Sequence, residues 1–166
     1  MLLRPAEPSD ALPVARIHCR AWQAGYRGLL PDAYLDGLRA EDRAARYTFG
    51  HPDPDRPQTI VAVEDGAVVG FATTGPADDG SGAGELLALH VHPDHWGRGH
   101  GRALLAAARD ALHRRGHAEA VLWILVGNQR AARVYEADGW RLDGGARPQV
   151  VWGIEVDELR YRRPLP

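Results

Sequence analysis

The chain contains no lysine, one cysteine, one methionine and two phenylalanines among its 166 residues. Because Cys19 is alone, neither an intrachain disulfide nor a cluster of thiolates can form, and a reducing compartment is expected. Apolar runs such as Ala120–Val126 are far shorter than the ~20 residues that cross a bilayer. The amino-terminal residues also lack the apolar core of a signal peptide. We therefore expect a cytoplasmic protein that does not associate with membranes.

The chain also lacks a large excess of charge of either sign. Its 20 basic residues, all arginine, stand against 22 acidic residues, which leaves a net charge of −2. General nucleic-acid binding needs a basic surface, so no nucleic-acid partner is expected. Hydrophobic residues (45%) and charged residues (25%) are close to the averages of globular proteins. Without repeats, a linker or a low-complexity tract, residues 1–166 are expected to form a single domain.

What the sequence does contain is an alternation of helical and strand patterns. Apolar residues recur at helical spacing over residues 12–26, 33–47, 101–115 and 128–139. The second of these helices is expected to break near Gly37. Strand patterns cover residues 2–6, 59–64, 67–73, 85–91, 120–126, 140–142 and 150–162. The dipeptide Asp65-Gly66 is typical of a tight hairpin, and the element order predicts a mixed α/β fold with helices on both faces of the sheet.

A glycine-rich turn joins one of these strands to a helix. Residues 96–101 read Trp-Gly-Arg-Gly-His-Gly, and Arg98 and Arg102 add positive charge. Glycines let the backbone approach an anion closely, and the unpaired amides and dipole of a helix start favour phosphate. The spacing matches neither a P-loop nor the Gly-x-Gly-x-x-Gly turn of dinucleotide-binding folds. On this turn alone, a plain tight connection remains an alternative.

Two motifs in the right order make this chain resemble the GNAT family of acyl-CoA-dependent N-acetyltransferases. Trp96–Gly101 resembles the family's Arg/Gln-x-x-Gly-x-Gly/Ala turn, with tryptophan at the Arg/Gln position. Asn128–Trp140 resembles Asn-x-x-Ala-x-x-x-Tyr-Glu-x-x-Gly-aromatic. The element order matches over nearly the whole chain. The resemblance implies an α/β fold whose mixed, mostly antiparallel sheet has about seven strands and about four flanking helices, with the fourth and fifth strands splayed apart.

The resemblance also implies that acetyl-CoA is the co-substrate and that no metal takes part. In the family, the splayed strands leave backbone groups unpaired, and the pantetheine arm fills the gap like an added strand. This assigns the backbone of Leu89 and Val91 to pantetheine, makes the Val91 amide the oxyanion donor, and places the pyrophosphate on the glycine-rich turn. The expected cofactor-binding residues are Leu89, Val91, Trp96, Gly97, Arg98, Gly99, His100, Gly101, Arg102, Ala103, Asn128, Ala131 and Tyr135.

Acetyl transfer to an amine needs a proton acceptor, because an alkylammonium with a pKa of about 10.4 is almost wholly protonated at pH 7. Glu85 is the candidate base, since it begins the strand before the turn, where the resemblance places the glutamate of histone-acetylating members. A solvated carboxylate is the other interpretation. Strand alternation predicts that Glu85 shares a face with Leu89 and Val91, opposite His90. His90 and His92 are alternative bases.

Tyr135 is the candidate general acid for the departing thiolate. It follows Asn128 by seven residues, so the two side chains share a helix face. Proton transfer from a phenol of pKa about 10 to the thiolate of a thiol of pKa about 8.5 is only slightly unfavourable in free energy. Trp22, Tyr26 and Arg27 lie where the family's first two helices border the acceptor pocket, and aromatic walls suit an amine. Ordinary helix packing is the alternative for these three.

Two other functions remain open at this point. The run His-Val-His-Pro-Asp-His matches a signature of binuclear zinc hydrolases through His90, His92, Asp94 and His95. No histidine follows His117, so the distal ligands of such a site are missing. The second alternative is a non-catalytic sensor of acyl-CoA. For the acetyltransferase, the acceptor is expected to be a small-molecule amine, with peptide or protein amines and a homodimer left open.

Overall fold

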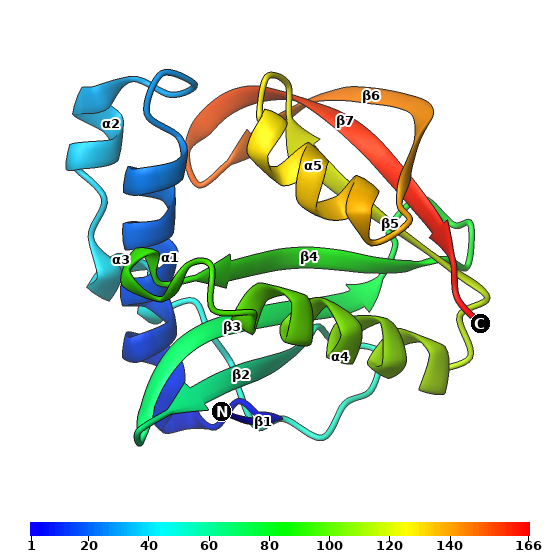
Figure 1. Cartoon of the computed structure of the whole chain (residues 1–166), viewed down its shortest axis with the longest axis horizontal. Coiled ribbons are helices and arrows are strands. Elements are labelled where there is room, and N and C mark those ends of the chain that lie inside the picture. The colour runs from blue at the N-terminus through cyan, green and yellow to red at the C-terminus, as the bar shows by residue number, and fades with distance from the viewer.

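The computed structural model describes residues 1–166 and contains one seven-stranded sheet (Figure 1). The strand order is β1-β2-β3-β4-β5-β7-β6, and only the β4–β5 pair is parallel. The mixed, mostly antiparallel sheet expected from the sequence is therefore confirmed. The strands are β1 (Leu2–Pro5), β2 (Gln58–Glu64), β3 (Ala67–Pro76), β4 (Gly84–Val91), β5 (Glu119–Leu125), β6 (Arg141–Val151) and β7 (Ile154–Pro164).

Five α-helices connect the strands, one more than expected, because the break near Gly37 is complete. None of them is long and apolar enough to cross a membrane. Asn128 accepts a hydrogen bond from the Ala131 amide at 3.2 Å and caps the last helix. The helices are α1 (Ala11–Gly25), α2 (Asp32–Asp36), α3 (Ala40–Ala44), α4 (His100–Arg114) and α5 (Gln129–Ala137), with short 3-10 helices at Pro8–Asp10 and Pro93–His95.

The helices cover both faces of the sheet (Figure 1). Neighbouring residues of a strand point to opposite faces, and Ala72 and Phe71 of β3 mark the two sides. Ala72 packs in the largest core cluster with Leu104 of α4 and Tyr135 of α5. Phe71 packs with Val14 of α1 in a second cluster. The molecule therefore has an α4–α5 side and an α1 side.

Strands β4 and β5 part after three paired positions. Residues 84–86 align with residues 120–122, and no further pair follows. Both strands continue beyond that point, β4 to Val91 and β5 to Leu125. The splay expected between the fourth and fifth strands is confirmed.

A β-bulge in β4 changes the face that Glu85 occupies. The register between β3 and β4 shifts in the middle of the pair, and Leu87 is left as an extra residue. Simple alternation predicted that Glu85 shares a face with Leu89 and Val91. This prediction is wrong, because the extra residue returns Glu85 to the face of His90, on the α1 side.

The carboxy-terminal hairpin also differs from the prediction. The sequence predicts separate strands at 140–142 and 150–162, whereas β6 runs continuously to a tight turn at Trp152 and Gly153. Both turn residues have positive φ, 49° and 78°. The sequence misses this turn because it lacks an Asn-Gly or Asp-Gly pair. The register between β6 and β7 shifts between Leu142 and Ala146, so β6 can include Gly144 and Gly145, which look like strand breakers in the sequence.

Candidate functional site

A cleft of about 770 Å³ lies at the opening between β4 and β5. Most of the expected cofactor-binding residues line it, namely Leu89, Val91, Trp96, Gly97, Gly99, His100, Gly101, Arg102, Asn128, Ala131 and Tyr135. Arg98 and Ala103 do not line it. The Arg98 guanidinium instead lies 3.6 Å from the Glu64 carboxylate. The two motifs, far apart in sequence, therefore meet at one cavity.

Backbone amides of β4 face this opening. The His92 amide donates to the Val69 carbonyl at 2.8 Å. Because bonded and non-bonded positions alternate along an antiparallel pair, the amides of Leu89 and Val91 point away from β3 and toward the splay. The Val91 carbonyl already accepts a hydrogen bond from the Trp96 indole at 2.8 Å. Two amide donors are thus presented to whatever occupies the gap.

The glycine-rich turn places the start of α4 against the same cleft. Gly99 has a φ of +89°, in the left-handed region that favours glycine. A Cβ built at Gly99 would meet no atom within 4 Å, so the space in front of the turn is open to a ligand. The first amides of α4 have no partner within the helix, and the helix dipole makes them a site for an anion.

Positive side chains add to this anion site. Arg102, Arg130 and Arg133 line the cleft, against one acid, Asp138. Asp138 itself is paired with two other arginines. The Arg130 guanidinium lies 3.3 Å from the centre of the Trp96 ring, a cation–π contact that joins α5 to the turn. Sequence analysis assigned no role to Arg130 or Arg133; their place just after the capping residue of α5 is the signal it missed.

Two tyrosines reach the cleft from opposite sides of the sheet. Burial raises the pKa of the Tyr135 phenol, and the neighbouring Tyr26 adds to the rise. Burial likewise raises the pKa of Tyr26 to about 12. Both phenols are therefore protonated hydrogen-bond donors at neutral pH. Because its pKa is raised, complete proton transfer from Tyr135 to a thiolate costs more free energy than transfer from an ordinary phenol.

Glu85 lies beside the cleft, on the α1 side, and does not line it. The residue is 7% exposed. Burial raises its pKa to about 7; Arg147 opposes the rise, and Asp78 and Glu158 add to it. The carboxyl is thus half ionised near neutral pH and suited to accept and release a proton.

More side chains gather on the face of Glu85. Trp123 of β5 lines the cleft, and the Arg147 guanidinium lies 4.0 Å from the centre of its ring. Arg147 also lies 3.7 Å from Glu158. Burial raises the pKa of Glu158, and Arg147 opposes that rise. The sequence contains no signal for these three residues, because they come from three strands that no motif connects.

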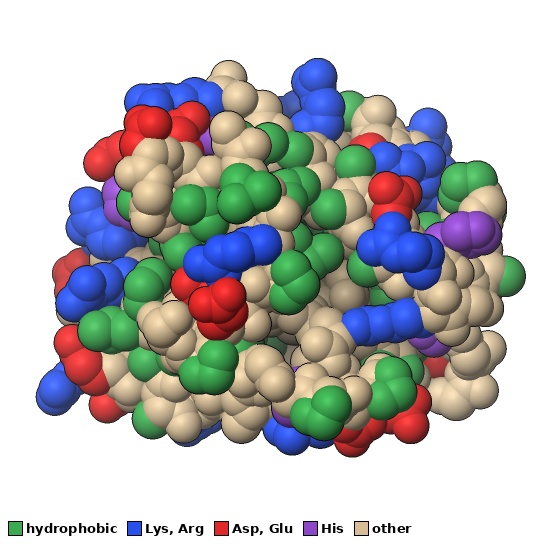
Figure 2. Space-filling model, turned by 90° about the horizontal axis from the view of Figure 1, so that it is seen from below, with side chains coloured by type: hydrophobic (Ala, Val, Ile, Leu, Met, Phe, Trp, Pro, Cys, Tyr) green, Lys and Arg blue, Asp and Glu red, His purple; other side chains and the backbone are tan.

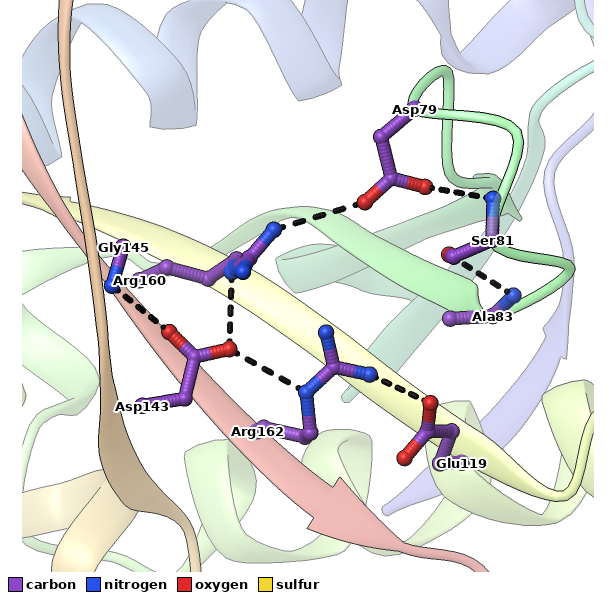
Figure 3. A network of polar contacts seen from close by, with 8 residues as sticks. All are labelled: Asp79, Ser81, Ala83, Glu119, Asp143, Gly145, Arg160 and Arg162. Carbon is purple, nitrogen blue, oxygen red and sulfur yellow. Dashed lines mark hydrogen bonds and ion pairs between the residues drawn. The ribbon is translucent and has the colours of Figure 1, made fainter.

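An ion-pair network links β5, β6, β7 and the loop between β3 and β4 (Figure 3). Arg160 and Arg162 of β7 donate to Asp143 of β6 at 2.8 and 3.1 Å. Arg160 also reaches Asp79, in the loop between β3 and β4, at 3.4 Å. Arg162 pairs with Glu119 of β5. The network therefore ties the β3–β4 loop to the carboxy-terminal hairpin.

Of the three residues expected at the acceptor pocket, Tyr26 alone lines the cleft. Trp22 is 4% exposed, and its indole N–H donates to Nε2 of His90 at 3.4 Å. Arg27 lies at the surface, 3.2 Å from Asp32 and also paired with Asp36. Helix packing and surface ion pairing account for the positions of Trp22 and Arg27.

The run of histidines does not come together as a binuclear metal site. Burial lowers the pKa of His90 to about 4, with Arg43 adding to the effect, so this imidazole is a weak base. Nδ1 of His92 accepts a hydrogen bond from the Asp94 amide at 3.2 Å, and His92 does not line the cleft. His95 turns toward β2. Of the two alternative bases, His90 lines the cleft and His92 does not.

Charges of both signs are mixed on one face of the molecule (Figure 2). The face drawn in Figure 2 carries arginine, acidic and hydrophobic side chains close to one another. No broad patch of one sign dominates this face. The arginines of the cleft differ from those on this face because they lie around the open space in front of α4.

Known proteins resemble this chain in sequence and in fold. Residues 16–140 match the model of the acetyltransferase (GNAT) family. The uncharacterized N-acetyltransferase YuaI of Bacillus subtilis is 27% identical over 135 residues, which cover 76% of this chain and 72% of that protein. The mycothiol acetyltransferase of Kineococcus radiotolerans is 36% identical over 137 residues, which cover 82% of this chain but 39% of that protein. The crystal structure of PaiA N-acetyltransferase from Thermoplasma acidophilum in complex with coenzyme A has a TM-score of 0.73 at 17% identity, with 98% of both chains covered, a likeness of fold alone.

Proposed function

The chain belongs to the acetyltransferase (GNAT) family, and from this premise we propose that it transfers an acetyl group from acetyl-CoA to the amine of a small molecule. Residues 1–166 act as one acetyltransferase domain in this proposal. The observation that carries it is the opening between β4 and β5, where the cleft meets the amides of Leu89 and Val91. An extended amide chain such as pantetheine can pair with these groups as an added strand would.

The start of α4 is the proposed pyrophosphate site. The glycine turn leaves open space there, and the first helix amides supply donors. Arg102, Arg130 and Arg133 supply opposite charge around the same space. Asn128 caps α5 and also lines the cleft, which puts its amide group within reach of the pantetheine arm.

Transfer proceeds by direct attack of the amine on the thioester in a ternary complex. The C–N bond forms while the thioester carbonyl becomes an oxyanion, which accepts a hydrogen bond from the Val91 amide. The C–S bond then breaks, and the thiolate leaves. The proton of the amine passes to Glu85 through a water, since the carboxylate lies beside the cleft rather than in it.

Tyr135 stabilises the leaving thiolate. Because burial raises its pKa, the phenol stays protonated until charge develops on the sulfur. A hydrogen bond from the phenol to that sulfur is strong in a buried site and stabilises the thiolate as it leaves, without complete transfer of the proton. Tyr26, which also lines the cleft, borders the amine.

A small-molecule amine is favoured by the chemistry of the acceptor side. Trp123 and Tyr26 line the cleft with aromatic surface, and the Glu85 carboxyl lies beside it. The related mycothiol acetyltransferases act, by name, on a small molecule, and this supports the same class for this chain. A peptide or protein amine is the alternative acceptor.

The test is release of coenzyme A from acetyl-CoA over a panel of primary amines, with N-terminal peptides and lysine peptides included. Release that saturates with one class of amine is the expected result. Saturable binding of acetyl-CoA without release over any amine would favour a non-catalytic sensor instead.

A further inference from the structure

A second group of polar side chains lies at the two ends of the glycine turn; two of its members also line the cleft, but the mechanism above gives their side chains no role. It consists of Glu64 at the end of β2, His95 before the turn, and His100 at the start of α4. One potential ligand atom from each lies within 4.8 Å of the others. His95 Nδ1 is 3.0 Å from one Glu64 oxygen, and His100 Nε2 is 3.5 Å from the other.

The buried imidazole of His100 is incompletely satisfied. It is 3% exposed, yet its Nε2 has no hydrogen-bond partner. Its Nδ1 lies 2.9 Å from the sulfur of Met1, which can only accept a hydrogen bond. In the neutral imidazole, Nδ1 then carries the proton and Nε2 directs a lone pair toward a Glu64 oxygen 3.5 Å away. A cation shared between these two atoms, either a proton or a metal ion, would remove their repulsion.

We propose that Glu64, His95 and His100 bind one divalent transition-metal ion of the zinc class. Two imidazoles and a carboxylate are ligands that zinc takes in proteins. Tetrahedral coordination with bonds of about 2.0–2.1 Å places neighbouring donor atoms ~3.3 Å apart. The separations of 3.0 and 3.5 Å to the two oxygens of Glu64 are close to this value, and all three potential ligand atoms lie within 4.8 Å of one another.

The surroundings allow an ion to enter and to complete its coordination. The side chains of Glu64 and His95 are 27% and 26% exposed, so water reaches the fourth position. Arg98 competes for the same carboxylate at 3.6 Å, but its side chain is 56% exposed and can turn into solvent. The hydrogen bond from His100 Nδ1 to Met1 holds the tautomer whose Nε2 coordinates.

Such an ion would tie three segments together behind the proposed pyrophosphate site. His95 and His100 flank Trp96, Gly97 and Gly99, which line the cleft. The ion fixes both ends of this turn and adds positive charge behind it. By linkage, it raises the affinity for coenzyme A, and coenzyme A raises the affinity for the ion by the same factor. This coupling rests on the proposed function, whereas binding of the ion does not.

The test is calorimetric titration of the metal-free full chain with Zn²⁺ in a buffer that does not coordinate metal. We expect one ion per chain. Glu64→Gln and His95→Gln should each weaken binding by at least ~100-fold, since each removes a ligand. These positions are chosen because both side chains are partly exposed, whereas replacement of the buried His100 can disturb folding. His113→Gln, an exposed histidine on α4 outside the cluster, is the matched control and should bind as the parent does.

Absence of binding by the parent chain, or equal binding by the folded Glu64→Gln and His95→Gln variants, would overturn the site. The coupling has its own readout, the affinity for coenzyme A with Zn²⁺ and with chelator. We expect a difference of about fivefold or more in the parent and none in Glu64→Gln. Equal affinities in the parent would overturn the coupling and leave the ion site standing. Failure of coenzyme A to bind at all would count against the proposed function and not against the ion site.

Discussion

The two sides of the opening between β4 and β5 are built from different kinds of groups. On the α4–α5 side, the cleft presents backbone amides, the glycine turn and arginines. On the α1 side, Glu85, Trp123 and Arg147 come from three strands and depend on one another through buried contacts. Backbone groups can bind any ligand of the right shape, whereas individual side chains discriminate between ligands. We therefore expect the first side to determine cofactor binding and the second to determine the acceptor and its proton.

The largest expected effect is loss of cofactor binding in Gly99→Glu, which alters the first side alone. The new side chain would fill the open space before α4, bring negative charge to the diphosphate and strain a φ of +89°. Calorimetry should show acetyl-CoA affinity weakened by at least about 100-fold.

Gly116→Glu is the matched control for that experiment. Gly116 has a φ of +88°, and its Cβ would also meet nothing within 4 Å, but it lies at the other end of α4. It should retain parental affinity. Equal losses in both variants would assign the effect to backbone strain, and unchanged affinity in Gly99→Glu would place the diphosphate elsewhere.

Tyr135 lies where the two sides meet, and the Tyr135→Phe substitution should show whether its hydroxyl acts in cofactor binding or in the chemical step. It keeps the ring and removes the hydroxyl, so acetyl-CoA affinity should change by at most about 1 kcal/mol. The single-turnover rate at saturating amine should fall by about 10²–10⁴-fold, and this measurement avoids any limit set by product release. Tyr161→Phe is the control, because that buried phenol donates to Glu136 and does not line the cleft. A parental rate in Tyr135→Phe would leave Tyr135 as a packing residue.

Glu85→Gln should alter the second side alone. The carboxylate form accepts the proton, so the parental rate should rise with pH around the Glu85 pKa of about 7. The variant should lose this rise, with a rate about 10–100-fold lower at pH 8. Glu158→Gln should keep the rise and move its midpoint to lower pH, because the Glu158 charge raises the pKa of Glu85. A pH profile unchanged in Glu85→Gln would mean that the proton leaves by another route.

The smallest expected effect concerns stability. Folding raises the pKa of Glu85 from 4.5 to about 7, so the folded chain binds this proton more tightly than the unfolded chain. The resulting stabilisation is complete below about pH 4.5 and is lost as pH rises to about 7. Urea unfolding should therefore show that the parent loses stability relative to Glu85→Gln between pH 4.5 and 7. If the difference in the free energy of unfolding between the two chains stayed constant across this range, Glu85 would not have the pKa that burial raises.

The comparison of the two sides also explains what could be predicted from the sequence. The glycine turn and the start of α5 at Asn128 each follow a local pattern within one segment, where turn and helix signals are strong. The splay joins two distant strands and is implied by the family resemblance alone. Of the thirteen cofactor-binding residues that the resemblance implies, eleven line the cleft and Arg98 and Ala103 do not, while Arg130 and Arg133 line it without having been expected.

The α1 side could not be predicted, because its geometry depends on irregularities with weak local signals. The bulge at Leu87 reverses the face of Glu85, and nothing in the surrounding residues indicates an extra position. The turn at Trp152 and Gly153 brings Arg147 and Glu158 opposite each other in register, although the sequence predicts one uninterrupted strand over 150–162 and none at Arg147. Side chains that meet only across strands need the register, which sequence pattern alone does not supply.

The central claim is that the amides of Leu89 and Val91 are open to the cofactor. Amide hydrogen exchange followed by NMR, with and without acetyl-CoA, tests this most directly. In the free chain these two amides should exchange quickly, whereas His90, which pairs with β3, should already be protected. Saturating acetyl-CoA should protect Leu89 and Val91 strongly and change His90 little. Unchanged exchange at both amides while acetyl-CoA is bound would contradict the account.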